Sequence, residues 1–418
     1  MDVANVPGLT DKFAAALDRL GPFEPRPKLA VAVSGGADSM SLALLAREWA
    51  ARRGGDILAL TVDHGLRPES GHEASAALGI LAERGIPGRK LTVPDLARGS
   101  GLAERAREAR YRLLLQACSD LDIPHLLLGH HRGDQVETVM MRALSSSTAR
   151  GLAGMPAAVE TRSVRLLRPL LNVAPDHLRE FLTARAVPWT EDPSNSDPRA
   201  LRARLRAARA DPWGVSEGTL AVACSARNAG AFRAGQDRSV ARILAERVAI
   251  WPEGHAVMTP GPIEPEALAA LLRMIAGAHH APPIDRVAAV ARSPAPATLG
   301  GVRIVLAGRL GPGWLLVKEA RALAGPVAVR PNAVWDGRFR LTCLPDARDP
   351  DMTLGALGPD AARFRNRSNL PALVLHGLPA LRLGGIPVAV PHIGVGNSRW
   401  RLIFDPRNPA AGAPFLFG

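Results

Sequence analysis

The chain is poor in aromatic residues and cysteine. Only 4% of its 418 residues are aromatic, with a single tyrosine, so stacking platforms for many unpaired bases are scarce. The three cysteines, Cys118, Cys224 and Cys343, form no CxxC pair and no zinc-ligand spacing, which favours a reducing, cytoplasmic setting. No stretch of 18 apolar residues occurs and the first residues contain no apolar signal sequence, so the sequence predicts no membrane partner.

Lysine is also rare, although the chain is basic. There are 52 lysines and arginines against 39 acidic residues, a net charge of +13, and only four of the basic residues are lysine. Arginine has a planar guanidinium that binds phosphates through two hydrogen bonds. The excess therefore favours a nucleic acid or another polyanion as partner.

Strand and helix patterns alternate from Lys28 to about Pro193. Short apolar stretches predict strands at 29–33, 57–62, 88–93, 125–128 and 164–168. This alternation predicts an α/β fold, a Rossmann-like parallel sheet with helices on both faces. Later residues show helices, a hairpin at 303–306 and 314–317, and then short glycine-rich strands. We expect three domains: a catalytic domain at 1–210, a mostly helical domain at 211–328 and a small β-rich α+β domain at 329–418.

The first predicted strand ends in Ser-Gly-Gly-Ala-Asp-Ser, residues 34–39, and a helix pattern follows at once. A strand, a glycine-rich turn and a helix N-terminus together form an anion site, because free N–H groups and the positive helix end meet there. The turn is neither a Walker loop nor a G-x-G-x-x-G fingerprint. Its S-G-G-x-D-S spacing is that of the pyrophosphatase loop, found in enzymes that cleave ATP, release pyrophosphate and adenylate a substrate.

Several ordered motifs resemble those of the bacterial tRNA(Ile)-lysidine synthetase family. The matching stretches are AVSGGADSM, LTVDHGLRPESGHEA, AREARYRLL, GHHRGDQVET, GLAGM, LLRPLL and EDPSNSD. The resemblance implies a ligase that uses ATP to attach L-lysine to C2 of the wobble cytidine in the CAU anticodon of an isoleucine tRNA. An adenylated tRNA is the intermediate, and AMP and diphosphate are released. The oligomeric state, a homodimer included, is left open.

The resemblance also implies an ATP site and a magnesium site. The ATP-binding residues expected are Ser34, Gly35, Gly36, Ala37, Asp38, Ser39, Asp63, His64, Gly129 and His130. Mg²⁺ favours carboxylate and phosphate oxygens, so Asp38 and Asp134 are expected to hold it. Together with His131 they are the predicted catalytic residues. A nearby carboxylate or histidine is needed to accept the proton of the lysine amine.

Arginines on two helix patterns are the candidates for tRNA contact. They are Arg107, Arg110, Arg199, Arg202 and Arg206. The last three share one helical stripe with Arg209, while Leu201, Leu205 and Ala208 form a neighbouring stripe that can pack against the body. A solvated amphipathic helix explains the same spacing, and the resemblance favours contact with tRNA or ATP.

The chain departs from the family pattern at several positions, among them Ala103, Ala200 and Ala203. Gly133 stands where the family usually has the first of two adjacent aspartates, and residues 145–148 replace a basic, glycine-rich segment. One alternative is another pyrophosphatase-loop tRNA-modifying enzyme, such as a thiolase, which would need well-placed cysteines. A second is a non-catalytic RNA-binding relative, although the intact loop, Asp38 and Asp134 disfavour it.

Overall fold

The computed structural model of the chain divides into two compact units, Met1–Gly235 with Ala413–Gly418, and Gln236–Gly412. It describes residues 8–65, 70–94, 99, 101–145, 147, 149–191, 201–211, 213–343, 351–397, 400–412 and 415–416. Within these ranges, no helix combines the length and apolar character needed to cross a membrane.

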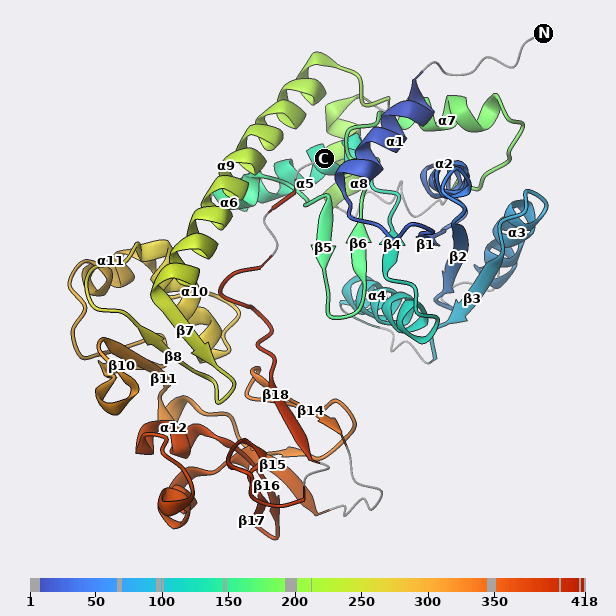
Figure 1. Cartoon of the computed structure of the whole chain (residues 1–418). Coiled ribbons are helices and arrows are strands. Elements are labelled where there is room, and N and C mark those ends of the chain that lie inside the picture. The colour runs from blue at the N-terminus through green and yellow to red at the C-terminus, as the bar shows by residue number, and fades with distance from the viewer. Residues whose placement is uncertain are drawn as a thin grey trace. The chain divides into compact units, whose positions relative to one another are not determined.

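A six-stranded sheet forms the centre of the first unit (Figure 1). Its order is β3-β2-β1-β4-β6-β5, and all neighbours are parallel except β5 and β6. The strands are β1 Lys28–Ala32, β2 Asp56–Asp63, β3 Gly88–Thr92, β4 His125–Leu127, β5 Ala158–Glu160 and β6 Arg165–Leu167. The five predicted strands are confirmed, and β5 adds an antiparallel edge.

Helices cover both faces of this sheet, as predicted (Figure 1). The described helices that lie wholly within the first unit are α1 Leu9–Arg19, α2 Ala37–Ala51, α3 Ser70–Ala82, α4 Leu102–Asp120, α5 Arg132–Leu144, α6 Ala149–Leu152, α7 Pro175–Thr183 and α8 Leu201–Arg209. Successive side chains of a strand point to opposite faces. Leu29 and Val31 of β1 therefore pack with α1, α2 and α7, whereas Ala30 and Ala32 pack with α4.

The order of the sheet reverses beside β1. Strands β2 and β3 lie to one side of it, and β4, β6 and β5 lie to the other. Open α/β sheets bind ligands at such a switch point, beyond the carboxyl ends of the strands. The predicted loop at 34–39 follows β1 and the segment 129–131 follows β4, so the topology places both motifs at this point.

Antiparallel sheets and helices form the second unit, with strand orders β7-β8-β11-β10-β9, β12-β15-β16-β17 and β13-β14-β18. The helices are α9 Glu217–Arg247, which begins in the first unit, α10 Pro265–Ala276, α11 Ile284–Arg292 and α12 Ala372–Gly377, with 3₁₀ turns η2 Gly308–Leu310, η3 Ala320–Ala322, η4 Gly358–Arg367 and η5 Pro391–Ile393. The strands are β7 Val248–Trp251, β8 His255–Met258, β9 Ala297–Leu299, β10 Val302–Leu306, β11 Trp314–Lys318, β12 Val327–Ala328, β13 Val334–Trp335, β14 Phe339–Cys343, β15 Met352–Ala356, β16 Pro379–Leu383, β17 Ile386–Ala389 and β18 Arg401–Phe404. The predicted hairpin is present as β10 and β11, and it belongs to a larger sheet.

A buried ionic cluster stabilises the second unit. The carboxylate of Asp336 accepts hydrogen bonds from Lys318 Nζ at 2.6 Å, Arg338 Nε at 2.9 Å and the N–H of Ala324 at 3.0 Å. The Asp336 and Arg338 side chains are only 1% and 2% exposed. Residues on both sides of the predicted domain boundary at 328 therefore share one compact unit, and their independent folding stays a prediction.

Candidate active site

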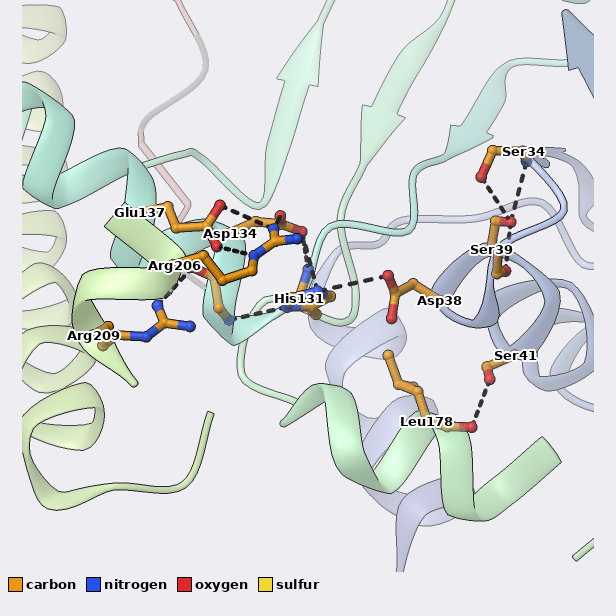
Figure 2. Close-up of polar contacts among 12 residues, drawn as sticks. Ser34, Asp38, Ser39, Ser41, His131, Asp134, Glu137, Leu178, Arg206 and Arg209 are labelled. Carbon is orange, nitrogen blue, oxygen red and sulfur yellow. Dashed lines mark hydrogen bonds and ion pairs between the residues drawn. The ribbon is translucent and has the colours of Figure 1, made fainter. Parts of the chain in front are cut away.

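The loop between β1 and α2 is a tight turn closed by its own serines (Figure 2). Gly35 has a φ of +87°, a conformation that favours glycine. Ser39 Oγ accepts the N–H of Ser34 at 3.1 Å and donates to the carbonyl of Gly36 at 3.0 Å. Helix α2 therefore begins directly after a turn that carries no bulky side chain, as close approach of a phosphate requires.

Two distant segments pack against this loop. A Cβ atom at Gly129 would lie 3.3 Å from the backbone nitrogen of Ser39, so the chain after β4 touches the first turn of α2. Thr190 donates its N–H to the carbonyl of Gly35 at 2.9 Å, and Ala37 is buried. The loop is thus fixed from two sides by backbone contacts.

His131 connects the loop to the helix that carries Asp134. Its Nδ1 accepts the N–H of Gly133 at 3.0 Å and caps α5, while Asp134 Oδ2 accepts the N–H of His131 at 3.0 Å. Because Nδ1 accepts a hydrogen bond, the neutral ring carries its proton on Nε2. That Nε2 lies 3.6 Å from Asp38 Oδ2 and 3.7 Å from Asp134 Oδ2 (Figure 2). The three predicted catalytic residues are therefore neighbours in space.

The pKa values of the two carboxyl groups shift in opposite directions. Burial raises the pKa of Asp38 above its ordinary value of 3.8; His131 acts against this, and the negative charge of Asp134 adds to it. Burial also acts to raise the pKa of Asp134, but the charges of His131 and His130 and a backbone hydrogen bond lower it on balance. Two facing carboxyl groups with separated pKa values are typical of functional sites.

The same two carboxylates are the residues that were predicted to hold Mg²⁺. In the described part of the chain, no group of three or more His, Cys, Asp and Glu side chains is arranged to hold a metal ion. Mg²⁺ commonly takes one or two carboxylates and completes its shell with water and substrate phosphates. Asp38 and Asp134 fit that requirement, because they approach the same imidazole and each raises the electrostatic cost of the other's charge.

Helix α8 packs its arginines against α5. Arg206 Nε and Nη2 donate to the two carboxylate oxygens of Glu137 at 2.8 and 3.2 Å (Figure 2), and Glu137 is fully buried. Arg206 Nη2 also lies 4.0 Å from Asp134 Oδ1. Arg209 Nη1 donates to the carbonyl of Gly133 at 3.5 Å.

This orientation of α8 corrects the prediction from the sequence. Leu201 and Ala208 are exposed, whereas Arg202, Arg206 and Arg209 are half-buried. The prediction was wrong for Leu201 and Ala208, whereas Leu205 is half-buried; the ion pair of Arg206 with the buried Glu137 directs this side of α8 towards α5. Arg199 lies outside the described residues.

A second basic group surrounds His130. It consists of Arg107 and Arg110 of α4 and Arg168 after β6, and Arg110 also acts on His64 after β2. Burial lowers the pKa of His130 to about 4 and also lowers that of His64, and neighbouring arginines add to both effects. In the described structure, Nδ1 of each ring is buried without a hydrogen-bond partner. Buried polar atoms left unpaired beside cationic side chains are suited to bind a polar, anionic ligand.

Asp63 organises the turn after β2. Its Oδ1 accepts hydrogen bonds from Ser70 Oγ at 2.6 Å and from the N–H of Gly65 at 2.9 Å. These bonds, that of Ser70 above all, lower the pKa of Asp63. The side chain therefore ties the beginning of α3 to β2, and its contact with adenosine stays a prediction.

Sequence reasoning missed Glu137 and Arg168. Glu137 stands one helical turn after Asp134 in the GDQVET motif, so its spacing was the available signal. Arg168 is 7% exposed and donates through Nη1 to the carbonyl of Pro156. Its place beside His130 depends on the pairing of β6 with β4, which no local pattern reveals.

Comparisons with known proteins agree with this geometry. Residues 9–210 match the family model of the PP-loop domain. The tRNA(Ile)-lysidine synthase of Mesorhizobium japonicum is 37% identical over 349 residues, which cover 79% of this chain and 76% of the relative. That of Ruegeria pomeroyi is 33% identical over 387 residues, 90% of each chain, and that of Rhizobium meliloti is 35% identical over 381 residues, 84% of this chain and 79% of the relative.

Among solved structures, the U34-tRNA thiolase NcsA from Methanococcus maripaludis aligns at 17% identity over 54% of this chain and 79% of that chain, with a TM-score of 0.44. That score is too low to indicate a shared overall fold. The similarity to the synthases, by contrast, covers up to 90% of this chain, and the family model spans the residues of the loop, the His pair and Asp134. The chain belongs to the tRNA(Ile)-lysidine synthase family.

Proposed function

We propose that this chain ligates L-lysine to C2 of the wobble cytidine in the CAU anticodon of an isoleucine tRNA. In the first step, the cytidine O2 attacks the α-phosphorus of ATP and diphosphate leaves. In the second, the lysine amine attacks C2, and AMP leaves with the former O2. The meeting of Asp38 and Asp134 at His131, beside the phosphate-binding loop, carries the proposal.

ATP use is supported by the match to the PP-loop domain. The turn of Ser34 to Ser39 offers backbone donors and hydroxyls for the phosphates. Asp38 and Asp134 would hold Mg²⁺, which neutralises charge on the leaving diphosphate when bound. A readout independent of ligation is the affinity for a fluorescent ATP analogue, which Mg²⁺ should increase in the wild type and not in Asp38→Asn.

The lysine amine must lose a proton before it attacks. His131 Nδ1 is occupied by the N–H of Gly133, and its Nε2–H is directed between two carboxylates. The ring is thus arranged as a donor, so a carboxylate is the better candidate for the proton acceptor.

Free lysine carries two ammonium groups and one carboxylate, and a site for it must supply the opposite charges. Asp134 and Glu137 lie on one side of α5, and Arg206 adjoins both. The carboxylate of Asp134 matches an ammonium group, and the partly exposed guanidinium of Arg206, which the buried Glu137 orients, matches the lysine carboxylate. We therefore place the amino acid beside this trio.

The tRNA would approach from the side of α4. Arg107 and Arg110 adjoin the unpaired ring nitrogen atoms of His64 and His130, and guanidinium groups bind phosphates. Arg202 and Arg206 of α8 face the carboxylates of α5. We therefore expect them to contact only the part of the tRNA that lies next to the reacting cytidine.

The proposal is tested by transfer of radiolabelled lysine to an isoleucine tRNA transcript with a CAU anticodon, in the presence of ATP and Mg²⁺. The wild type should label the tRNA, and Asp38→Ala should not. Asp11→Ala is the matched control, since Asp11 is exposed on α1. A folded wild type that binds the tRNA but never incorporates lysine would overturn the proposal and favour a non-catalytic relative.

The described cysteines give little support to the alternative that this chain is a tRNA thiolase. Burial raises the pKa of Cys118 to about 12, which leaves the thiol protonated and unreactive. Cys224 is exposed on α9, outside the strand ends that form the loop site.

A further inference from the structure

A cavity of about 580 Å³ lies along α7. It is lined by Asp176, Arg179 and Glu180 of α7 and by Trp189 and Trp213. Trp213 is 50% exposed, so much of its indole is accessible to a ligand. None of these five side chains has a part in the reaction described above.

Trp213 stands on a rigid turn. The buried carboxylate of Asp211 accepts the N–H groups of Gly214, Val215 and Ser216 at 2.9 to 3.2 Å. It also accepts the hydroxyls of Ser216 and Thr219 at 2.7 and 2.6 Å. Because these bonds hold the backbone that follows Trp213, binding of a ligand would remove less backbone freedom there.

The same turn is tied to the catalytic segment. Arg132, which stands between His131 and Gly133, donates from Nη1 to the carbonyl of Gly214 at 3.1 Å. Its Nε and Nη2 donate to the carbonyl of Asn172 at 3.2 and 2.7 Å. One guanidinium therefore fixes the position of the Trp213 turn relative to His131.

The α7 wall of the cavity packs against the helix that follows the loop. Ser41 Oγ of α2 donates to the carbonyl of Leu178 at 2.9 Å, which holds α7 against α2 (Figure 2). The charge of Arg179 acts on Asp38, where it opposes the effect of burial on the pKa of that carboxyl group. The helix that lines the cavity is thus held against the helix that carries Asp38, and a charged group of the cavity acts on that residue.

We propose that this cavity binds an unpaired base of the RNA substrate, one that flanks the reacting cytidine. The inference rests on the proposed function, because it takes a single-stranded anticodon loop as the ligand. Indoles and guanidinium planes stack on bases of any sequence, and carboxylates accept hydrogen bonds from exocyclic amino groups. The two acids of the wall disfavour a phosphate there, so the chemistry of the cavity fits a base edge.

The test uses the full chain and an anticodon stem-loop with 2-aminopurine on one or the other side of the cytidine. Stacking quenches this fluorophore. We expect the bound stem-loop to be quenched with wild type and with Trp213→Phe, and to be brighter with Trp213→Leu. The KM for tRNA should rise roughly 10-fold in Trp213→Leu, which corresponds to about 1.4 kcal/mol and lies within the range of base–aromatic stacking.

Phe232→Leu is the control for loss of an exposed aromatic, since Phe232 is 64% exposed on α9. It should change neither the quenching nor the KM. Unchanged quenching and an unchanged KM for tRNA in a folded Trp213→Leu would overturn the proposal. A rise in the KM for lysine alone would also overturn it, because that result would place the amino acid in the cavity. Quenching by wild type without any lysine transfer would leave the base site standing and refute the proposed ligation.

Discussion

The Nε2 atom of His131 lies 3.6 Å from Oδ2 of Asp38. The histidine caps α5 and the aspartate begins α2, so this contact joins the ends of two strands that are neighbours in the sheet. A single imidazole thus has two duties: Nδ1 stabilises a helix, and Nε2 faces Asp38 and Asp134.

Substitution of His131 separates these duties. Asparagine is a good helix cap and can keep the bond to Gly133, but it has no group at the place of Nε2. We expect His131→Asn to keep near-wild-type stability and to lower kcat on the order of 100-fold, the effect of removing a positioned donor. His131→Ala should also lose about 1 kcal/mol of unfolding free energy, the usual contribution of a cap. Lysine-transfer kinetics and thermal unfolding measure the two effects, and full activity of His131→Asn would exclude a part for Nε2.

The pair of Glu137 and Arg206 should hold α8 in place. Glu137→Gln leaves the guanidinium without its buried partner, and we expect a loss of about 1–3 kcal/mol, reduced because Arg206 is 38% exposed. Faster hydrogen exchange of the α8 amides and a higher KM for lysine should accompany it. Arg206→Met should cost more, because it leaves the buried carboxylate of Glu137 unpaired, and the double variant should be more stable than Arg206→Met alone. Arg204→Met, an exposed arginine of the same helix, is the control. Additive effects of the two substitutions would contradict the pairing.

Gly133 suits the geometry of this chain. A Cβ atom there would lie 2.8 Å from Cε1 and 3.1 Å from Nδ1 of His131, so a side chain would displace the imidazole. Restoring the usual family residue with Gly133→Asp should therefore reduce lysine transfer, and Gly133→Ala should do the same.

Gly79→Ala is the matched control, because a Cβ atom at this helical position meets nothing within 4 Å. It should raise stability by roughly 0.5–1 kcal/mol. Higher activity of Gly133→Asp than of wild type would show that the glycine is a defect of the site and not an adaptation.

His255 should make stability depend on pH. Burial lowers its pKa from 6.5 to about 4, and both ring nitrogens are buried without partners in the described structure. Between pH 6.5 and 4 the unfolded chain binds a proton that the folded chain does not, so the free energy of unfolding falls as the pH falls. The loss approaches about 3 kcal/mol at pH 4 and then levels off.

His255→Phe should reduce this pH dependence, which denaturant titrations at pH 7 and pH 4.5 can measure. His130 and His392, with similarly lowered pKa values, account for part of the remainder. His72→Asn, at an exposed position of α3, should leave the pH dependence unchanged. A slope in His255→Phe equal to that of the wild type would show that His255 is not buried as a neutral ring.

The sequence by itself determined the strands, the loop and the family. Apolar stretches, glycine turns and helical periodicity are local properties of the sequence, so they can be recognised without knowledge of the fold. The crevice could be predicted too, since parallel strands end at the same edge and both the 34–39 loop and His130–His131 follow such ends.

Only the tertiary structure decided which side of α8 packs against α5 and which residues line the cavity along α7. A stripe of arginines has the same spacing whether it faces solvent or a buried carboxylate, and the burial of Glu137 decides between the two. Likewise, Trp189 and Trp213 are separated in the chain by α8, and only packing places both on one cavity. Contacts between distant segments depend on which surfaces meet when the chain folds, and no local pattern contains that information.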